Sequence, residues 1–240
     1  MKSVSNFSIQ PLAFSLCLND WTQLRQAVVD AGRRLLAEGL VARTWGNVSV
    51  RAGPEHMLIT PSGRAYESMT PEDIVPVNLR TGAHDGPLKP SSEGKLHAEI
   101  YRTRSEIQAV IHTHQMNAST VAAARREVPP ILDDMVQIIG PTVRVADYAL
   151  PSTNKIVRVT VKALRGRMAA LMANHGAVCL GRNLDEAFVV CQVLEKACKA
   201  FIEAEFLGGA KSINRIEAFL MHQVYLRKYS ALKDENPRDR

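Results

Sequence analysis

The sequence contains no hydrophobic run that could span a membrane, and it has few aromatic residues. A membrane helix needs about 18 consecutive apolar residues, and no stretch of the 240-residue chain approaches that length. Aromatic residues make up 5% of the chain, too few for a platform that stacks the bases of single-stranded nucleic acid. The first 17 residues hold one lysine and a short apolar run without a small-residue cleavage site. We therefore expect neither a signal peptide nor a membrane partner.

The four cysteines lack the spacing of a zinc finger or a redox motif. Cys17, Cys179, Cys191 and Cys198 include no CxxC pair. Cys191 and Cys198 lie seven residues apart in an apolar helical pattern, which places both on one buried face. Because core thiols are typical of a reducing compartment, we expect a cytoplasmic protein.

Positive charge is in excess but is not concentrated in any run. The formal net charge is +6, and the basic residues are scattered and interleaved with acids. No run of five or more like charges occurs, so the sequence does not predict a nucleic-acid partner. The same surplus attracts small anionic substrates, which is the interpretation we favour.

Hydrophobic periodicity and turn residues predict a single mixed α/β domain. The chain is 46% apolar and 22% charged, as in an ordinary globular protein, and it is long enough to fold without disulfides or a structural metal. We expect an arm over residues 1–19, one domain over 20–232 and a solvated tail over 233–240. Helices are predicted over residues 20–39, 92–102, 118–125, 156–165, 183–207 and 213–229, and strands over 48–50, 57–60, 74–77, 109–114, 142–145, 170–173 and 177–180.

Three histidines have the spacing of a catalytic metal site. His112 and His114 stand two apart at the end of a predicted strand, so both side chains point to the same face. His175 lies before Gly176 in a tight turn between two apolar strands. Three imidazoles without a fourth protein ligand leave a coordination position open, as in catalytic zinc sites. Taken alone, each pattern also fits polar residues at strand ends or a buried structural histidine.

Short stretches rich in glycine, serine, threonine and asparagine provide turns that could hold a phosphate. They are residues 44–49, 60–63 and 90–93, and exposed backbone N–H groups at such turns bind phosphate well. None forms a Walker loop or a GxGxxG motif, so no nucleotide is indicated at these turns. Glu93 stands where a helix should begin, either as a capping carboxylate or as a general base beside a metal. His97, four residues later, would orient another group rather than bind metal.

The order and spacing of five motifs resemble the class II aldolase/adducin-like family, and within it the sugar-phosphate aldolases of the L-fuculose-phosphate type. The resemblance extends over roughly residues 21–205. It implies a single three-layer αβα domain with a central, mainly antiparallel sheet. The motifs are Gly46-Asn47-Val48-Ser49, Thr60-Pro61-Ser62-Gly63, Pro90-Ser91-Ser92-Glu93, His112-Thr113-His114 and Asn174-His175-Gly176.

The same resemblance assigns roles to individual residues. It implies that His112, His114 and His175 bind one zinc ion, or another divalent metal, and that Glu93 is the catalytic acid/base. It also implies a homotetramer with active sites between subunits. The residues of the implied phosphate pocket are Gly46, Asn47, Ser62, Gly63, Ser91 and Ser92.

These expectations combine into a zinc-dependent lyase. The resemblance implies retro-aldol cleavage of a phosphorylated ketose or sugar-acid derivative through a metal-stabilised enediolate. Alternatives on the same scaffold are a 3-oxo-tetronate-phosphate decarboxylase, a pentulose-phosphate 4-epimerase and a methylthioribulose-phosphate dehydratase. Family epimerases typically carry aspartate at the position of Glu93, which favours aldol chemistry. A non-enzyme alternative is an adducin-like oligomeric scaffold, although adducin heads lack the zinc histidines.

Tyrosines are the part of the family pattern that this chain matches least. Family aldolases use one tyrosine in a loop after the His-x-His motif and another from the C-terminal region that reaches a neighbouring subunit. After His114 the chain has Asp133 and Asp134 in the corresponding loop, and Tyr148 comes late. Tyr225 and Tyr229 are both candidates for the C-terminal tyrosine.

Overall fold

The computed structural model describes residues 21–235, with side chains through residue 228. The predicted arm over residues 1–19 and the last residues of the predicted tail, 236–240, lie outside this part of the chain. Helix α7 (Arg215–Glu235) extends past the predicted end of the domain at residue 232. The boundaries 20–232 therefore stay a prediction.

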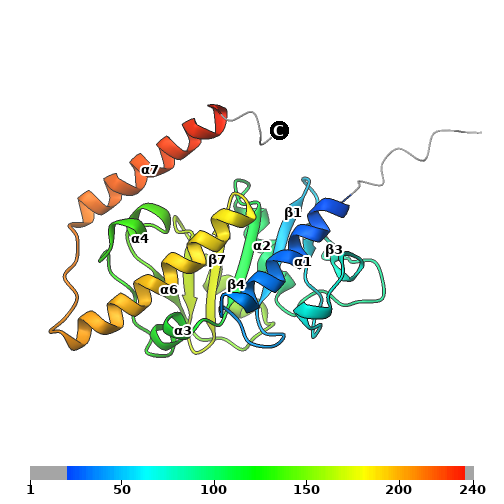
Figure 1. The fold of residues 1–240 in the computed structure, drawn as a ribbon, viewed down its shortest axis with the longest axis horizontal. Helices are drawn as coiled ribbons and strands as arrows, with labels where there is room; N and C mark the ends of the chain where they lie inside the picture. The colour runs from blue at the N-terminus through cyan, green and yellow to red at the C-terminus, as the bar shows by residue number, and fades with distance from the viewer. Residues whose placement is uncertain (1–20, 236–240) are drawn as a thin grey trace, which may run out of the picture.

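A seven-stranded sheet forms the middle of the molecule, as Figure 1 shows. Its strands follow the order β3-β2-β1-β4-β7-β6-β5. Every neighbouring pair is antiparallel except β5 with β6, which is parallel. The prediction of a mainly antiparallel sheet is confirmed. The strands are β1 (Asn47–Ala52), β2 (His56–Ile59), β3 (Val75–Asn78), β4 (Ala109–Thr113), β5 (Arg144–Ala146), β6 (Ala169–Met172) and β7 (Gly176–Gly181).

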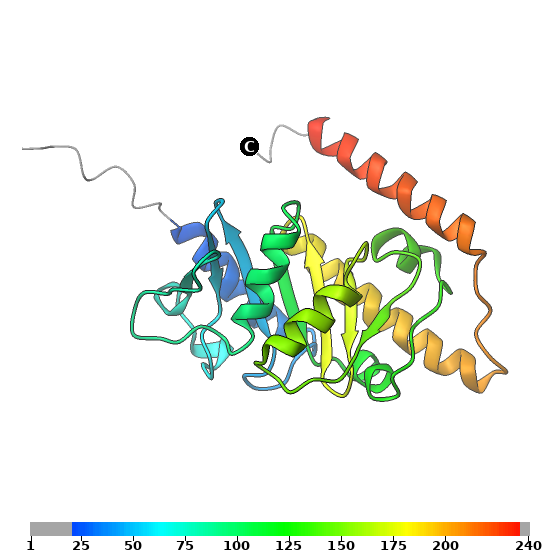
Figure 2. The same ribbon diagram turned by 180° about the vertical axis from the view of Figure 1, so that it is seen from behind.

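Helices cover both faces of the sheet and make the predicted three layers. α1 (Thr22–Ala37) and α6 (Leu184–Phe206) lie on one face, with α3 (Met116–Ala123) packed against α6. α2 (Gly94–Thr103) and α5 (Asn154–Ala163) lie side by side on the other face, which Figure 2 shows from the front. Because both faces are covered, the central strands β4, β6 and β7 are buried along their whole length.

Charged and polar contacts connect α1 and the residue after it to α6. The guanidinium of Arg34 stacks over the ring of Phe188 at 4.1 Å from its centroid. The amide of Gln192 donates a hydrogen bond to Glu38 at 2.8 Å. At the start of α6, the side chain of Asn183 accepts from the backbone N–H of Glu186 at 2.7 Å, and this N-cap explains where the helix begins.

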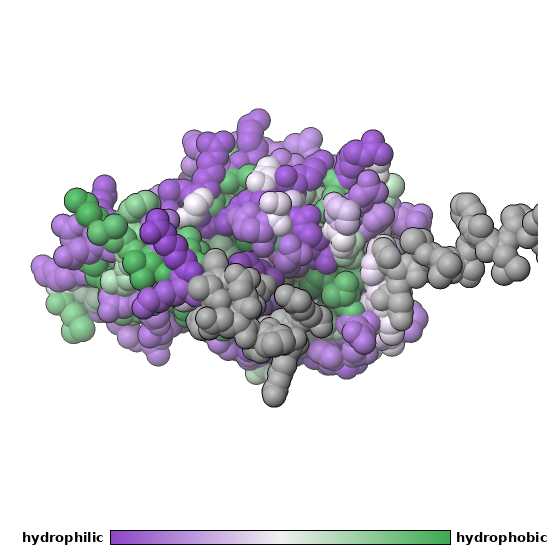
Figure 3. All heavy atoms as spheres, turned by 90° about the horizontal axis from the view of Figure 1, so that it is seen from above, coloured by the Kyte–Doolittle hydropathy of each residue, from purple (hydrophilic) through white to green (hydrophobic). Residues whose placement is uncertain are grey.

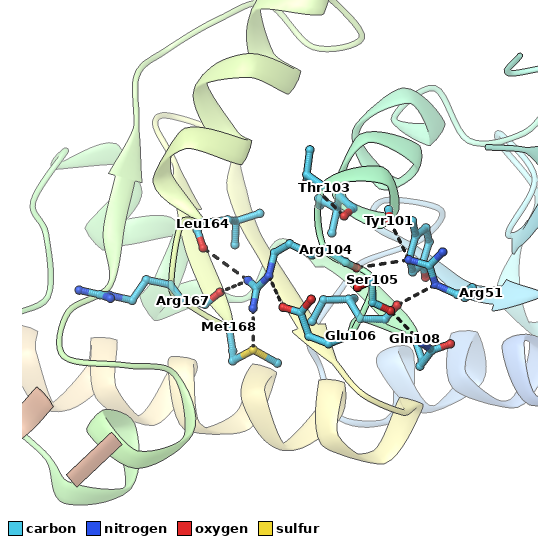
Figure 4. A network of polar contacts seen from close by, with 12 residues as sticks. Arg51, Tyr101, Thr103, Arg104, Ser105, Glu106, Gln108, Leu164, Arg167 and Met168 are labelled. Atoms are coloured by element: carbon cyan, nitrogen blue, oxygen red, sulfur yellow. Dashed lines mark hydrogen bonds and ion pairs between the residues drawn. The ribbon is translucent and has the colours of Figure 1, made fainter. Parts of the chain in front are cut away.

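Arginines fix the C-terminal end of α2, as Figure 4 shows. The Arg104 side chain donates to the carbonyl oxygen of Arg167 at 2.5 Å and pairs with Glu106 at 2.8 Å. Arg51 on β1 donates to the carbonyl oxygen of Tyr101 at 2.7 Å. These bonds connect the C-terminal end of α2 to the sheet and to the α5–β6 connection. They thereby fix the position of the whole helix, including its N-terminal end at Glu93.

Several short elements were not predicted from the sequence. They are two 3₁₀ helices, η1 (Tyr66–Ser68) and η2 (Pro71–Asp73), and the helix α4 (Asp133–Ile138). α4 packs against α6 and α7. Within the described residues, no helix is both long and apolar enough to cross a membrane.

Candidate metal centre

Three imidazoles converge at one end of the central strands. His112 is the fourth residue of β4, His114 follows that strand, and His175 occupies the turn between β6 and β7. One ring nitrogen from each lies within 4.8 Å of the others. The Nε2 atoms of His112 and His114 are 2.8 Å apart. The structure thus brings together the three histidines that the sequence singled out, although His114 and His175 are 61 positions apart in the chain.

The ring of His112 is oriented by the backbone of the neighbouring strand. Its Nδ1 donates a hydrogen bond to the carbonyl oxygen of Ala177 at 2.8 Å. Since a carbonyl oxygen only accepts, Nδ1 carries a proton, and Nε2 faces the ring of His114. An outer hydrogen bond of this kind is what holds metal-ligating histidines in place.

Burial lowers the pKa of two of the three imidazoles. Desolvation lowers the pKa of His114 to about 3, and the neighbouring His112 and His175 contribute to the decrease. Desolvation, together with His112, also lowers the pKa of His175. A metal binds only the deprotonated ring, so both groups are ready to coordinate at neutral pH.

Glu93 brings a carboxylate to the same point from the start of α2. Its side chain is 6% exposed, with Oε2 at 3.1 Å from His112 Nε2 and Oε1 at 3.7 Å from His175 Nε2. The Asn47 amide donates to Oε2 at 3.0 Å. Glu93 makes no capping hydrogen bond with its side chain, so the capping role considered for it is not what the structure shows.

The charge state of Glu93 follows from opposing effects. Burial acts to raise its pKa, but His112, His175 and the Asn47 hydrogen bond outweigh burial and hold the pKa below the ordinary value. Glu93 is therefore a carboxylate at neutral pH. Its Oε1, which faces His175 Nε2, is buried without a hydrogen-bond partner. Lone pairs of nitrogen and carboxylate oxygen that converge on one point fit a divalent cation.

Four residues of the predicted phosphate pocket, Ser62, Gly63, Ser91 and Ser92, lie on two loops that are hydrogen-bonded to each other. The backbone N–H of Ser62 donates to the carbonyl of Lys89, and that of Ser91 donates to the carbonyl of Thr60, each at 3.0 Å. The Ser91 hydroxyl accepts from the backbone N–H of Glu93 at 3.3 Å. The side of these loops that carries Ser62, Gly63 and Ser92 is exposed.

Gly46 has a structural reason to be glycine. Its φ is +80°, and a Cβ there would lie 2.5 Å from Val41 Cγ1 and 2.7 Å from the carbonyl oxygen of His112. Only glycine combines this conformation with such a close approach to β4. Asn47, the next residue, is buried and directs its amide to Glu93, an orienting contact that the sequence did not predict.

Trp45 is a candidate site residue that the sequence analysis missed. Its side chain is 60% exposed, and its ring centroid lies 6.3 Å from that of His114. The chain has only two tryptophans, and the position of this one directly before Gly46 and Asn47 was the signal that could have drawn attention to it.

The tyrosines considered from the family pattern lie on other elements than the strands and turn that carry the three histidines. Tyr148 is 45% exposed in the segment after β5, and Tyr225 lies on α7. Asp133 and Asp134 form the first turn of α4. The side chain of Tyr229 lies outside the described part of the chain.

Fold and site together define a class. A three-layer α/β protein in which a histidine triad and a buried carboxylate converge is built like a metal-dependent enzyme. The chain matches the family described as the Class II Aldolase and Adducin N-terminal domain over residues 26–202, and it belongs to that family. Class II aldolases are metal-dependent, and the histidine triad could bind the metal.

Proteins similar to this chain are named as aldolases that act on sugar phosphates. The 5-methylthioribulose-1-phosphate/5-deoxyribulose-1-phosphate aldolase of Rhodospirillum rubrum is 35% identical over 202 residues, 82% of this chain and 90% of the relative. The 5-deoxy-D-ribulose 1-phosphate aldolase of Bacillus thuringiensis serovar kurstaki is 32% identical over 188 residues, 78% and 88% of the two chains. A solved L-fuculose 1-phosphate aldolase structure matches with a TM-score of 0.81 at 33% identity, covering 85% of this chain and 96% of the other. The resemblance is confirmed, and the chain is a class II aldolase, a carbon–carbon lyase.

Proposed function

We propose that this aldolase is a zinc-dependent lyase that cleaves a phosphorylated ketose, or a closely related sugar-acid derivative, by a retro-aldol reaction. The observation that carries the proposal is the convergence of three imidazoles and the Glu93 carboxylate at one point. The similar proteins are named for 5-deoxyribulose 1-phosphate, 5-methylthioribulose 1-phosphate and L-fuculose 1-phosphate. All three compounds are ketose phosphates, and this supports the proposed substrate class.

Zinc is the proposed metal because its ligands would be three histidine nitrogens. His112, His114 and His175 match the catalytic pattern in which three protein ligands leave one position free. Another divalent metal could use the same donors. When bound, zinc would supply a Lewis acid for the carbonyl and hydroxyl oxygens of the substrate.

Glu93 is the proposed acid/base. Cleavage of a carbon–carbon bond leaves a carbon that must gain a proton, and the reverse reaction must remove it. The Glu93 carboxylate, held by Asn47 at 3.0 Å, is the ionised group beside the triad that can carry this proton. Its burial keeps water away from the proton that it transfers.

The two hydrogen-bonded loops are the proposed phosphate anchor. Ser62 and Gly63 on one loop and Ser91 and Ser92 on the other present hydroxyls and exposed backbone next to the start of α2, with Gly46 and Asn47 beside them. The N-terminal end of a helix favours an anion. Binding of the phosphate would hold the reacting carbons in register with Glu93.

A homotetramer with active sites between subunits remains our proposal for the assembly. Four apolar side chains of α7 are at least half exposed: Ile216, Phe219, Leu220 and Val224. Figure 3, which views the molecule from the side of α7, shows hydrophobic residues in green among the polar ones at the end where this helix begins. An apolar helix face of this kind supports contact with another subunit, and Tyr225 on the same helix is a candidate to reach a neighbouring site. Light scattering after size exclusion measures the mass directly.

We further propose that the protein works in the cytoplasm. Cys179, Cys191 and Cys198 are all buried free thiols, as the spacing of Cys191 and Cys198 predicted. Such thiols suit a reducing compartment.

An assay of products tests the proposed reaction. Retro-aldol cleavage of a ketose 1-phosphate between its third and fourth carbons yields dihydroxyacetone phosphate and an aldehyde. A decarboxylase would release carbon dioxide, and an epimerase or dehydratase would leave the carbon chain intact. We expect aldehyde release from at least one of the three named ketose phosphates. Failure with all three in the presence of zinc, together with carbon dioxide release from a 3-oxo sugar-acid phosphate, would contradict the proposal.

A further inference from the structure

A large groove lies on the face of the molecule formed by α2 and α5, which Figure 2 shows from the front. Its volume is about 1090 Å³, and it is bounded by α2, by α5 and by the loop between β3 and α2. It shares Ser91 and Ser92 with the proposed phosphate anchor, but neither Glu93 nor any histidine of the triad lines it. We call this feature the basic groove, after six lining residues: Arg80, Lys95, Arg102, Arg158, Lys162 and Arg165.

The helical repeat explains why the basic residues gather here. Arg158 and Lys162 are four residues apart on α5, so they share one face of that helix, and Arg165 follows in the turn after its end. Lys95 and Arg102 are seven apart on α2 and likewise share a face. Residues that are scattered in the sequence therefore surround one volume in space.

The positive charge of the groove is mostly uncompensated. Glu99 is the one acidic residue that lines it, and it pairs with Arg102 at 2.6 Å. Among the described residues, none of the other five basic side chains takes part in an ion pair. The net charge of the whole chain is only +6, so this groove holds a large share of the surplus. Like charges around a concave surface raise the local concentration of anions.

The groove also has an apolar wall. Val157 and Val161, one helical turn apart on α5, are half-buried, and Ala98 on α2 is buried. Small-molecule sites typically have volumes of about 300–1000 Å³ and are lined mainly by apolar groups with a few polar ones. The combination differs from an ordinary solvated basic surface, which has no apolar wall and no enclosed volume.

We propose that the basic groove binds a small molecule that carries two or more phosphate groups on an apolar body, as a nucleoside triphosphate does. Several phosphates match five unpaired cations that come from α2, α5, the turn after α5 and the loop between β3 and α2. A base or similar group would contact Val157 and Val161. A single sugar phosphate brings too little charge to engage them all. Because the cations surround one volume, a small molecule fits better than an acidic protein surface. The site goes beyond the proposed lyase reaction, whose residues lie outside the groove apart from Ser91 and Ser92.

Calorimetric titration of the full-length protein with ATP and with inorganic tripolyphosphate tests the proposal. We expect saturable binding of one ATP per chain, and weaker binding of tripolyphosphate because it lacks the apolar body. Arg158→Glu and Lys162→Glu should each raise the Kd for ATP about tenfold, since each replaces an attraction by a repulsion. Lys155→Glu is the matched control, because Lys155 is exposed on the same helix but does not line the groove. It should change Kd by less than about twofold.

A variant of the metal centre separates this proposal from the proposed function. His114→Ala should bind ATP as the parent does, whatever happens to its lyase activity. Loss of ATP binding in His114→Ala would contradict the groove assignment. So would a rise in the Kd for ATP in Lys155→Glu as large as in the groove variants. Equal affinity for ATP and tripolyphosphate, or no saturable binding of ATP, would contradict it as well. A change of molecular mass in Arg158→Glu would contradict it in favour of an interface between copies. If the charge reversal in Arg158→Glu disturbs folding, Arg158→Gln is the variant to use, because it removes the attraction without adding a repulsion. It should raise the Kd for ATP about threefold.

Discussion

Two buried polar clusters share helix α2 and differ in what their atoms face. The first, which we call the metal cluster, consists of Glu93, His112, His114 and His175. The second, which we call the inner cluster, consists of Ser49, His97 and Tyr101, and its histidine lies one helical turn after Glu93. Both clusters are largely withdrawn from water.

In the inner cluster the side chains form hydrogen bonds with each other, and one atom, His97 Nε2, is buried without a partner. His97 Nδ1 lies 2.7 Å from the Ser49 hydroxyl, which lies 2.9 Å from the Tyr101 hydroxyl. Tyr101 also donates to the carbonyl oxygen of Ser49 at 3.0 Å. In the metal cluster, by contrast, imidazole lone pairs and a carboxylate face each other. Hydrogen bonds stabilise the inner cluster without a ligand. In the metal cluster, a bound cation would supply the attraction between the facing lone pairs.

A shifted pKa does not distinguish the two clusters. Burial lowers the pKa of His97 to about 3, and the pKa of His114 is also lowered to about 3, chiefly by burial. Burial disfavours a charged imidazole whether or not the ring has a function. The direction in which the remaining lone pairs point is what separates a ligand from a structural histidine. Variants of each cluster should therefore have separable effects.

The largest effect is expected from removal of a metal ligand. His114→Ala should lose nearly all bound metal and reduce aldehyde release to background, because two histidines hold zinc far more weakly than three. Metal content by mass spectrometry and the cleavage rate measure both effects. His56→Ala is the control, since His56 contacts Trp21 away from the cluster. If His114→Ala retains about one metal ion per chain, the assignment of the triad is wrong.

Glu93→Gln should separate chemistry from metal binding. We expect kcat to fall about 10²- to 10⁴-fold, the usual range for loss of a general acid/base, while metal content stays near that of the parent. Glu99→Gln, on the same helix and outside the cluster, should leave kcat within about twofold. A Glu93→Gln variant that turns over at the rate of the parent would show that another group carries the proton.

Substitution of Asn47 tests how a hydrogen bond sets the pKa of the Glu93 carboxylate. The hydrogen bond from Asn47 lowers the pKa of Glu93, so its removal in Asn47→Ala should raise that pKa. We expect the acid limb of the kcat/KM profile to move up by about one pH unit and kcat to fall about tenfold. Asn47→Asp, which adds a negative charge, should move the limb further. A profile of Asn47→Ala that superimposes on that of the parent would remove Asn47 from this role.

The smallest effect on turnover is expected from the inner cluster, where the change should appear in stability. An unfolded chain protonates His97 near its ordinary pKa of 6.5, whereas the folded protein holds the pKa at about 3. Between these values the unfolded state binds more protons, so the free energy of unfolding decreases as the pH falls. His97→Asn should reduce this slope by about 1.4 kcal/mol per pH unit.

Urea unfolding at several pH values, with a chelator present, measures the slope. The chelator removes the contribution of metal bound to the triad, and the comparison with the parent cancels that of His114. Metal content without chelator should stay near that of the parent. If His97→Asn loses metal, or keeps the full pH slope, the two clusters are not as separate as their contacts indicate.

Local patterns explain why the triad and the sheet could be predicted. His112 and His114 share a face because side chains alternate along β4, and Gly176 marks the turn that carries His175. The Asn47–Glu93 hydrogen bond could not be predicted, because it joins residues 46 positions apart through the packing of α2 on β1. α4 was missed because a six-residue helix depends on its contacts with α6 and α7 rather than on its own periodicity.

The basic groove could not be predicted from the sequence either, because its charged residues are not neighbours in the chain. Arg80, Lys95 and Arg158 lie far apart in the sequence, and no local run of charge announces a site. Only the packing of α2 beside α5 gathers them around one groove. The surplus that the sequence linked to a small phosphorylated substrate is thus located mainly away from the metal cluster.

The most direct test of a metal-dependent aldolase is the rate at which the protein releases dihydroxyacetone phosphate from a ketose 1-phosphate. The rate should be measured as purified, after removal of metal by a chelator, and after return of about one zinc ion per chain. The account predicts that the rate falls to background on removal of metal and recovers with zinc. Cleavage that continues unchanged after the metal is removed would contradict it.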